Sequence, residues 1–264
     1  MSQENLNIAI NAALKAGKKI LEIYQSDNFE IQVKSDNSPL TKADIASNQI
    51  IELFLKDTGI PILSEEGKDV PFENRQHWDT LWIVDPIDGT KEFIKRNGEF
   101  TVNIALVKNQ VPILGVIYAP ALNILYFSLE SLGAFKIKID THEQVTVDQL
   151  LENCQRLPIN KVNQTYTIVA SRSHLSTETE DFIKTMKSKH GAINLISIGS
   201  SLKLCLVAEG LAHCYPRLAP TMEWDTAAGH AICKAAGFNV VNWNTKSEMT
   251  YNRKQLRNDW FLVN

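Results

Sequence analysis

The chain has 264 residues, of which 44% are hydrophobic and 22% charged, so it can bury a sizeable core in one or two domains. Its formal net charge of -3 and its isoelectric point near 6.1 provide no general positive field, which argues against a nucleic-acid-binding protein. The four cysteines lie far apart in the sequence, a spacing that argues against a zinc site or a disulfide framework and favours reduced thiols in the cytoplasm.

The first half of the chain predicts two amphipathic helices and then short strands. Apolar residues recur at helical spacing over residues 5–25 and again over 42–56, where Thr41 is a candidate N-cap and Asp44 lies in the first turn. Short β-like runs follow, and we expect strands at 60–63, 81–84, 101–107, 113–118 and 124–127. The sequence has neither a signal-peptide pattern at its start nor an apolar run of about 18 residues, so no membrane-spanning helix is expected.

The second half predicts alternating strands and helices, which is typical of an α/β arrangement. We expect strands at 166–170, 195–198 and 238–241, and helices at 177–187, 201–209 and 225–236. The polar stretch at 140–155 is the expected boundary. It divides the chain into an α+β unit, residues 1–150, and an α/β unit, residues 151–264.

Acidic residues stand at the ends of predicted elements in three separate parts of the chain. The sequence DPIDGT at 85–90 ends an apolar strand, Glu65 ends another apolar run, and Asp225 opens a helix. Carboxylates together with a main-chain carbonyl are the ligands that hard cations such as Mg²⁺ prefer. Three alternatives stay open: Asp88 with Gly89 as a simple turn, Glu65 as a solvated loop residue, and Asp225 as a helix N-cap.

These segments resemble the inositol monophosphatase superfamily, whose acidic motif DPxDGT is followed downstream by a Trp-Asp pair, here Trp224-Asp225. The segments at 38–41, 91–101 and 224–230 further resemble the bacterial 3′(2′),5′-bisphosphate nucleotidases of the CysQ type, and the likeness extends through nearly the whole chain. The resemblance implies a layered αβαβα sugar-phosphatase fold, with the active site between an α+β half and an α/β half.

The resemblance also implies two or three bound Mg²⁺ ions. The implied ligands are Glu65, Asp85 and the Ile87 carbonyl for one ion, and Asp85, Asp88 and Asp225 for a second, with a third, weaker ion near Glu65. Two such cations can lower the pKa of a bound water and neutralise both ends of an in-line displacement at a phosphate ester. Inhibition by lithium is expected from the same analogy.

The resemblance assigns the activation of the attacking water to Thr90 paired with Asp44. An acidic residue in the first turn of a helix is also favoured by the helix dipole. The alternative interpretation is therefore that Asp44 only stabilises its helix and has no catalytic role. The main-chain amides at Gly89 and Thr90 can contact phosphate as well.

Further groups predict which phosphate ester is bound. Residues 199–203 open a helix whose free amides suit an anion, Lys203 adds a full charge, and Arg217 can hold a phosphate with two hydrogen bonds. The resemblance places substrate-binding groups at Glu65, Ile87, Asp88, Gly89, Thr90, His174, Ser200, Lys203, Arg217 and Asp225. Lys95 and Arg96 are interpreted as loop residues outside the core site.

The activity implied by the resemblance is hydrolysis of the 3′-phosphate of adenosine 3′,5′-bisphosphate to AMP and phosphate, also acting on its sulfated form, with a role in sulfur assimilation. A phosphatase of inositol or sugar phosphates with the same metals, and a catalytically silent metal or nucleotide sensor, are the alternatives. We expect a cytoplasmic monomer or homodimer with no nucleic-acid or obligate protein partner. Peripheral association with the inner face of the membrane rests on resemblance alone.

Overall fold

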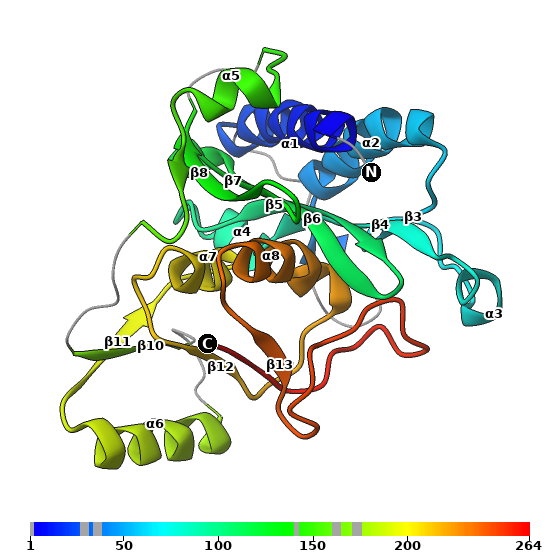
Figure 1. Ribbon diagram of the computed structural model, residues 1–264. Helices are drawn as coiled ribbons and strands as arrows, with labels where there is room; N and C mark the ends of the chain where they lie inside the picture. The colour runs from blue at the N-terminus through cyan, green and yellow to red at the C-terminus, as the bar shows by residue number, and fades with distance from the viewer. Residues whose placement is uncertain (1–2, 27–31, 34–38, 140–142, 160–164, 171–175) are drawn as a thin grey trace.

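The computed structural model describes residues 3–26, 32–33, 39–139, 143–159, 165–170 and 176–264, and its elements stack in alternating layers (Figure 1). Above the central sheet lie helices α1 (Gln3–Tyr24), α2 (Lys42–Leu55) and α5 (Val147–Leu151), and below it lie α7 (Leu202–Ala208) and α8 (Glu223–Ala235). Small sheets follow, and α6 (Thr177–His190) covers them from outside. This order is the predicted αβαβα arrangement.

The central sheet has seven strands that follow one another in chain order. They are β3 (Ile62–Ser64), β4 (Thr80–Asp88), β5 (Thr101–Lys108), β6 (Val111–Ala119), β7 (Ile124–Leu129), β8 (Gly133–Lys138) and β9 (Gln155–Arg156). β3 and β4 are parallel, and every other pair in this sheet is antiparallel. β9 lies beyond the expected boundary at residue 150 and still belongs to this sheet; the division into two units stays a prediction.

β4 is longer than predicted, since it continues from the apolar run into the acidic motif and ends at Asp88. Its register against β5 shifts between Asp85 and Asp88. Pro86 has no N–H to donate to the ladder, which accounts for an irregularity at this point. The irregular end of β4 lies at the edge of the sheet where the acidic residues gather.

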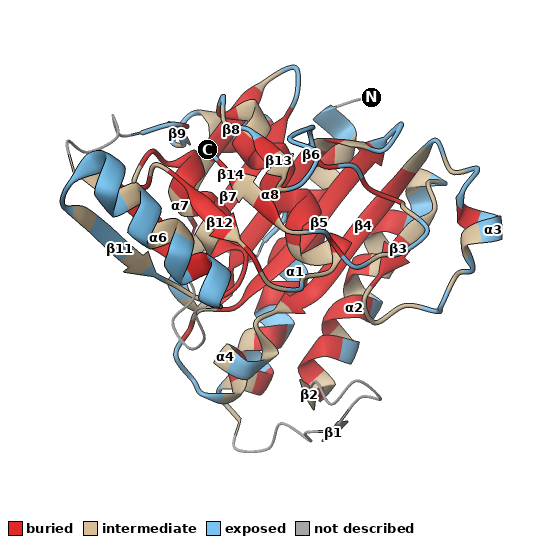
Figure 2. Ribbon diagram, turned by 90° about the horizontal axis from the view of Figure 1, so that it is seen from below, coloured by how far each residue is buried: buried red, intermediate tan, exposed pale blue. Residues whose placement is uncertain are grey.

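Hydrophobic cores fill both sides of the sheet. Leu6, Ile10 and Leu14 of α1 pack with one face of the sheet, while the other face packs against α7 and α8. Figure 2 shows buried residues along β4 and β5 and exposed residues along α6. The central strands are therefore covered on both faces, and this rigid sheet carries the acidic end of β4.

α8 approaches the sheet unusually closely at Gly115 of β6, where a Cβ atom would overlap the carbonyl oxygen of Ala228. The small buried residues Ala227, Ala228 and Ala231 form the helix face that packs there. Because α8 carries Asp225 in its first turn, the absence of a side chain at Gly115 helps to bring that carboxylate towards the sheet.

The second half contains two small sheets. β10 (Tyr166–Ala170) pairs in parallel with β11 (Ile193–Ser197), and β14 (Phe261–Val263) lies between β12 (Tyr215–Arg217) and β13 (Val240–Asn242). The predicted helices at 177–187, 201–209 and 225–236 correspond to α6, α7 and α8. Among the helices of the described segments, none is long and apolar enough to cross a membrane.

The remaining elements are short, and most of them lack a sequence signal. They are β1 (Gln32–Val33), β2 (Pro39–Leu40), α3 (Phe72–Arg75), α4 (Thr90–Ile94) and the 3₁₀ turns Lys56–Thr58 and Pro120–Leu122. An amphipathic pattern can be recognised in a sequence only over about three helical turns, so helices of four or five residues cannot be predicted from it. One of them, α4, borders the site.

Candidate active site

Three carboxylates converge from two elements. Asp85 and Asp88 lie at the end of β4, Asp225 lies in the first turn of α8, and one oxygen of each is within 4.8 Å of the others. Asp85 is buried, whereas Asp88 and Asp225 are half-buried. The structure thus brings together three of the predicted metal ligands that the sequence separates by up to 140 residues.

Glu65, the residue directly after β3, joins this cluster. Its backbone N–H donates to the Val84 carbonyl at 3.1 Å, and its side chain is hydrogen-bonded to Asp85. β3 runs parallel to β4, so both strands end at the same edge of the sheet. The fourth predicted carboxylate therefore lies beside the other three.

The cluster is electrostatically unfavourable without a cation. Burial, followed by Glu65, Asp88 and Asp225 as charged neighbours, raises the pKa of Asp85 well above its usual range. Burial and the charge of Asp88 raise the pKa of Asp225 to about 8. Burial also raises the pKa of Asp88 to about 6, although Lys203 and the Ser201 backbone N–H oppose the shift. Oxygen ligands that repel one another in this way fit a hard divalent cation.

The turn after β4 depends on Gly89. Its φ of +94° lies in the left-handed region, and a Cβ there would come within 3.1 Å of the Glu99 carbonyl oxygen. The turn also directs the Ile87 N–H to Asp85 Oδ1 at 3.0 Å and leads directly into α4. Asp88 and Gly89 do form a turn, and the same turn presents the carboxylates.

Asp44 and Thr90 are in contact, as the assigned pairing requires. Thr90 Oγ1 donates to Asp44 Oδ1 at 3.2 Å, while Asp44 Oδ2 accepts from the Thr41 N–H at 2.8 Å and from its hydroxyl at 2.6 Å. Thr41 is the N-cap of α2, and these bonds form a capping box. Asp44 therefore caps a helix with one oxygen and holds Thr90 with the other.

The alternative interpretation of Asp225 as a helix N-cap is wrong, because α8 begins at Glu223 and its N-cap is Met222. Asp225 is the third residue of the helix, and its Oδ2 accepts from the Met222 N–H at 2.8 Å. Glu223 is fully buried and accepts from the Asn252 N–H at 2.6 Å, which ties the first turn of α8 to the C-terminal loop. These bonds fix the position of the Asp225 carboxylate.

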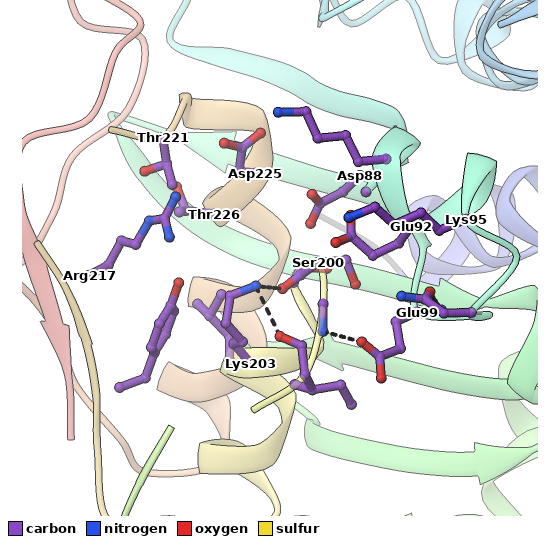
Figure 3. A pocket seen from close by; sticks show the side chains of 18 of the residues that line it. Asp88, Glu92, Lys95, Glu99, Ser200, Lys203, Arg217, Thr221, Asp225 and Thr226 are labelled. Atoms are coloured by element: carbon purple, nitrogen blue, oxygen red, sulfur yellow. Dashed lines mark hydrogen bonds between the residues drawn. The ribbon is translucent and has the colours of Figure 1, made fainter. Parts of the chain in front are cut away.

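A pocket of about 410 Å³ opens beside the cluster, within the size range of small-molecule sites. Figure 3 shows Asp88 and Asp225 on its wall, together with Lys203 and Arg217, which come from the same half of the chain as Asp225. The predicted residues that line it are Asp88, Gly89, Ser200, Lys203, Arg217 and Asp225. His174 lies outside the described residues.

The segment at 199–203 is already engaged in hydrogen bonds within the chain. The Gly199 N–H donates to Glu99 Oε2 at 2.8 Å, the Ser201 N–H bonds to Asp88, and Lys203 Nζ donates to the Ser200 carbonyl at 2.6 Å. Arg217 Nη2 donates to the Pro220 carbonyl at 3.0 Å. These hydrogen bonds hold the pocket wall together. The sequence predicted only an anion-binding role for the same groups.

Several lining residues were not predicted. Lys91, Glu92, Lys95, Glu99, Tyr215 and Thr221 also line the pocket. Placing Lys95 outside the core site is therefore wrong, whereas Arg96 is not among the lining residues and donates from Nη2 to the Ser26 carbonyl at 2.7 Å. Lys91 and Lys95 belong to α4, which is too short for its residue spacing to signal a pocket wall.

The chain is similar to known proteins over almost its whole length. The sequence model described as the inositol monophosphatase family matches residues 1–259. A curated Escherichia coli protein named 3′(2′),5′-bisphosphate nucleotidase CysQ is 45% identical over 255 residues, which cover 95% of this chain and 96% of that protein. The Haemophilus influenzae protein of the same name is 30% identical and covers 100% of this chain and 93% of its own length.

Solved structures also match this chain over almost its whole length. The crystal structure of CysQ from Bacteroides thetaiotaomicron, described as a bacterial member of the inositol monophosphatase family, matches with a TM-score of 0.92 and 54% identity, covering 100% of this chain and 97% of that one. A 2′-AMP-bound structure of SaIMPase-II matches with a TM-score of 0.74 and 21% identity, covering 99% of this chain and 89% of that one. The second match concerns the fold alone.

Proposed function

The chain belongs to the inositol monophosphatase family, and from this membership we propose that it is a 3′(2′),5′-bisphosphate nucleotidase that hydrolyses the 3′-phosphate of adenosine 3′,5′-bisphosphate. The products are AMP and phosphate. One observation carries the proposal: a carboxylate cluster adjoins a pocket lined by four cationic side chains, Lys91, Lys95, Lys203 and Arg217. Such a pocket suits a substrate with more than one phosphate.

We assign the metal sites to Glu65, Asp85, the Ile87 carbonyl, Asp88 and Asp225. When bound, Mg²⁺ lowers the pKa of water and neutralises charge on the phosphate oxygens. The raised pKa values of Asp85 and Asp225 support this assignment, because mutual repulsion of the carboxylates is relieved by a cation. Two or three ions are proposed per site.

The chain itself orients the attacking water through Thr90 and Asp44. The Thr90 hydroxyl donates a hydrogen bond to Asp44, so a lone pair of Oγ1 can accept a hydrogen bond from the attacking water, whose proton passes through Oγ1 to the Asp44 carboxylate. In-line attack by the water oxygen forms the new P–O bond as the bond to the 3′-oxygen of the ribose breaks. The ribose oxygen leaves with a proton from solvent.

The substrate assignment predicts a preference between two esters. We expect turnover of adenosine 3′,5′-bisphosphate to exceed that of inositol 1-phosphate by about 10²-fold or more in kcat/KM, since inositol phosphate lacks a second phosphate and a base. Phosphate release from both substrates in Mg²⁺ measures this ratio. Equal or inositol-favoured turnover would assign an inositol or sugar phosphatase, and binding of the nucleotide without turnover would assign a silent sensor.

The pKa of Asp225 predicts how Mg²⁺ binding depends on pH. Its value of about 8, against an ordinary 3.8, means that a proton competes with the metal below about pH 8, so affinity should rise from about pH 6 to pH 8. Without metal, the raised pKa costs the folded state stability as pH rises from about 4 to 8, so added Mg²⁺ should raise Tm more at pH 8 than at pH 6.

Calorimetric titration with Mg²⁺ in buffers of different ionisation enthalpy counts the protons released. Asp225→Asn is the matched control, because it keeps a side-chain oxygen to accept from Met222 while it removes the titrating group. An affinity that does not change with pH in the unmodified protein would contradict the prediction.

Action on the sulfated nucleotide, a role in sulfur assimilation, a cytoplasmic location and a monomeric or homodimeric state remain proposals that follow from the likeness to nucleotidases.

A further inference from the structure

The first turn of α8 is fastened by the side chain of Asn258. Its Nδ2 donates to the Met222 carbonyl at 2.6 Å, to Thr226 Oγ1 at 3.0 Å and to Thr221 Oγ1 at 3.1 Å. Met222 in turn donates its N–H to Asp225 Oδ2, so Asn258 holds residues on both sides of this carboxylate. Asn258 is buried and does not line the pocket. Figure 3 shows Thr221, Asp225 and Thr226 together on the pocket wall, so Asn258 acts on this wall by holding it in place.

Arg253 determines which end of the Asn258 amide faces α8. Its Nη2 donates to Asn258 Oδ1 at 3.0 Å. Because a guanidinium has no acceptor, the amide oxygen faces Arg253 and the amide nitrogen faces the Met222 carbonyl. Arg253 also forms an ion pair with the fully buried Glu223, from Nε to Oε1 at 3.1 Å, and its N–H donates to the same oxygen at 3.1 Å. The Asn258 amide therefore has one orientation.

The loop at 252–258 is also anchored to the first half of the chain. Arg75 of α3 is buried, and its Nη1 donates to Asn252 Oδ1 at 2.9 Å and to the Arg253 carbonyl at 2.7 Å. The Asn252 amide returns a hydrogen bond to the Arg75 carbonyl at 2.8 Å. α3 lies in the connection between Glu65 and β4. The loop thus joins the first turn of α8 to the segment that follows Glu65.

We propose that Asn258 is a positioning residue for Asp225 and that the loop at 252–258 thereby raises the affinity of the site for Mg²⁺. This inference rests on the proposed metal site and not on the proposed substrate. A mobile carboxylate loses conformational freedom when it binds a cation, and one that already accepts from the Met222 N–H loses less. Residues that orient a metal ligand typically contribute about 10–100-fold to metal affinity.

The first test is calorimetric titration of Mg²⁺ into Asn258→Ala, well below the Tm of the variant. The substitution removes the amide and keeps the backbone N–H of this residue, which donates to the Thr221 carbonyl at 2.8 Å. We expect Kd for Mg²⁺ to rise by about tenfold or more and Tm to fall by about 2–6 °C.

Thr146→Ala is the matched control. Thr146 is the N-cap of α5, which lies across the central sheet from α8 (Figure 1), and its hydroxyl accepts from the Gln149 N–H. Loss of an N-cap hydroxyl also lowers Tm, but it should change Kd for Mg²⁺ by less than about twofold. The comparison separates a lost positioning contact from a general loss of stability.

The second test follows amide hydrogen exchange of the unmodified protein with and without Mg²⁺. Coupling between two sites is reciprocal, so if the loop tightens the metal site, bound Mg²⁺ must tighten the loop. The informative amides donate to the Glu223 carboxylate and to the Thr221 carbonyl, and they belong to Asn252, Arg253 and Asn258. We expect their exchange to slow by about tenfold in saturating Mg²⁺, while the amides of α6 change less than about twofold.

Equal Mg²⁺ affinity in Asn258→Ala and the unmodified protein, or loop exchange that Mg²⁺ does not change, would overturn the inference. An equal rise of Kd in Thr146→Ala would overturn it as well. If Asn258→Ala does not fold, the exchange measurement decides alone. The two proposals fail separately: if the unmodified protein binds no Mg²⁺, the metal assignment falls and the role of the loop falls with it; if it binds Mg²⁺ and Asn258→Ala binds it equally well, only the role of Asn258 falls.

Discussion

Asp88→Asn is expected to lower kcat/KM for the bisphosphate by about 10³-fold or more and, at the same time, to stabilise the metal-free protein. The rate falls because the variant loses a charged ligand, and several kcal/mol of transition-state charge stabilisation depend on the bound metal. Stability rises because one of the repelling carboxylates becomes neutral while its oxygen still accepts from the Ser201 N–H. Phosphate release and thermal unfolding in the same buffer measure the two effects.

The stability gain has a defined pH dependence. The pKa of Asp88 is raised to about 6 from an ordinary 3.8, so this carboxyl costs the metal-free fold stability as pH rises from about 4 through 6. Asp88→Asn should therefore gain about 0.5–2 kcal/mol, or about 2–6 °C in Tm, at pH 8 and almost nothing near pH 4. The rise in Tm that Mg²⁺ produces should also shrink in this variant.

Asp57→Asn, an exposed carboxylate in the 3₁₀ turn Lys56–Thr58, controls for the loss of one negative charge and should alter neither rate nor Tm. A metal-free Asp88→Asn protein that unfolds earlier than the unmodified one would show that the cluster is not strained by repulsion. Retention of more than about a tenth of the activity would remove Asp88 from the metal site.

The acidic part of the site could be predicted from the sequence because its residues are local. Asp85, Asp88 and Gly89 belong to one short motif at the end of an apolar strand, and the strand itself has a clear pattern. The position of Asp225 beside these residues could not be predicted in the same way. It depends on α8 packing against β6 at Gly115, a contact between distant segments that no local pattern indicates.

The pocket wall could not be predicted for a related reason. Lys203 has the sequence context of an anion-binding helix start, but the left-handed Ser200, with φ of +50°, turns its own carbonyl towards the Lys203 amine. α4 is too short for a periodic signal, so Lys91 and Lys95 look like surface residues until the fold places them in the pocket. For Lys203 and for the pair on α4 alike, contacts between distant segments of the chain determine where the lysine amine lies.

The contact between Thr90 and Asp44 allows the catalytic interpretation to be separated from the structural one. Thr90→Val should lower kcat by about 10²–10⁴-fold with little change in KM, because it removes the hydroxyl that orients the water and keeps the side-chain volume. Thr90→Ser should restore most of the rate, since it keeps the hydroxyl. Asp44→Asn should resemble Thr90→Val, because an amide can no longer accept from both threonines in the same way.

The control is Thr41→Val, which weakens the same capping box from the other side. Loss of an N-cap hydroxyl costs about 1 kcal/mol of stability, so this variant should unfold earlier while its kcat changes less than about tenfold. Unfolding temperatures and steady-state kinetics of the four variants separate the two roles of Asp44. If the rates simply follow the unfolding temperatures, Asp44 acts only as a helix cap and the water must be oriented by other groups; if Thr90→Val is slow but as stable as the unmodified protein, the hydroxyl acts in the chemical step.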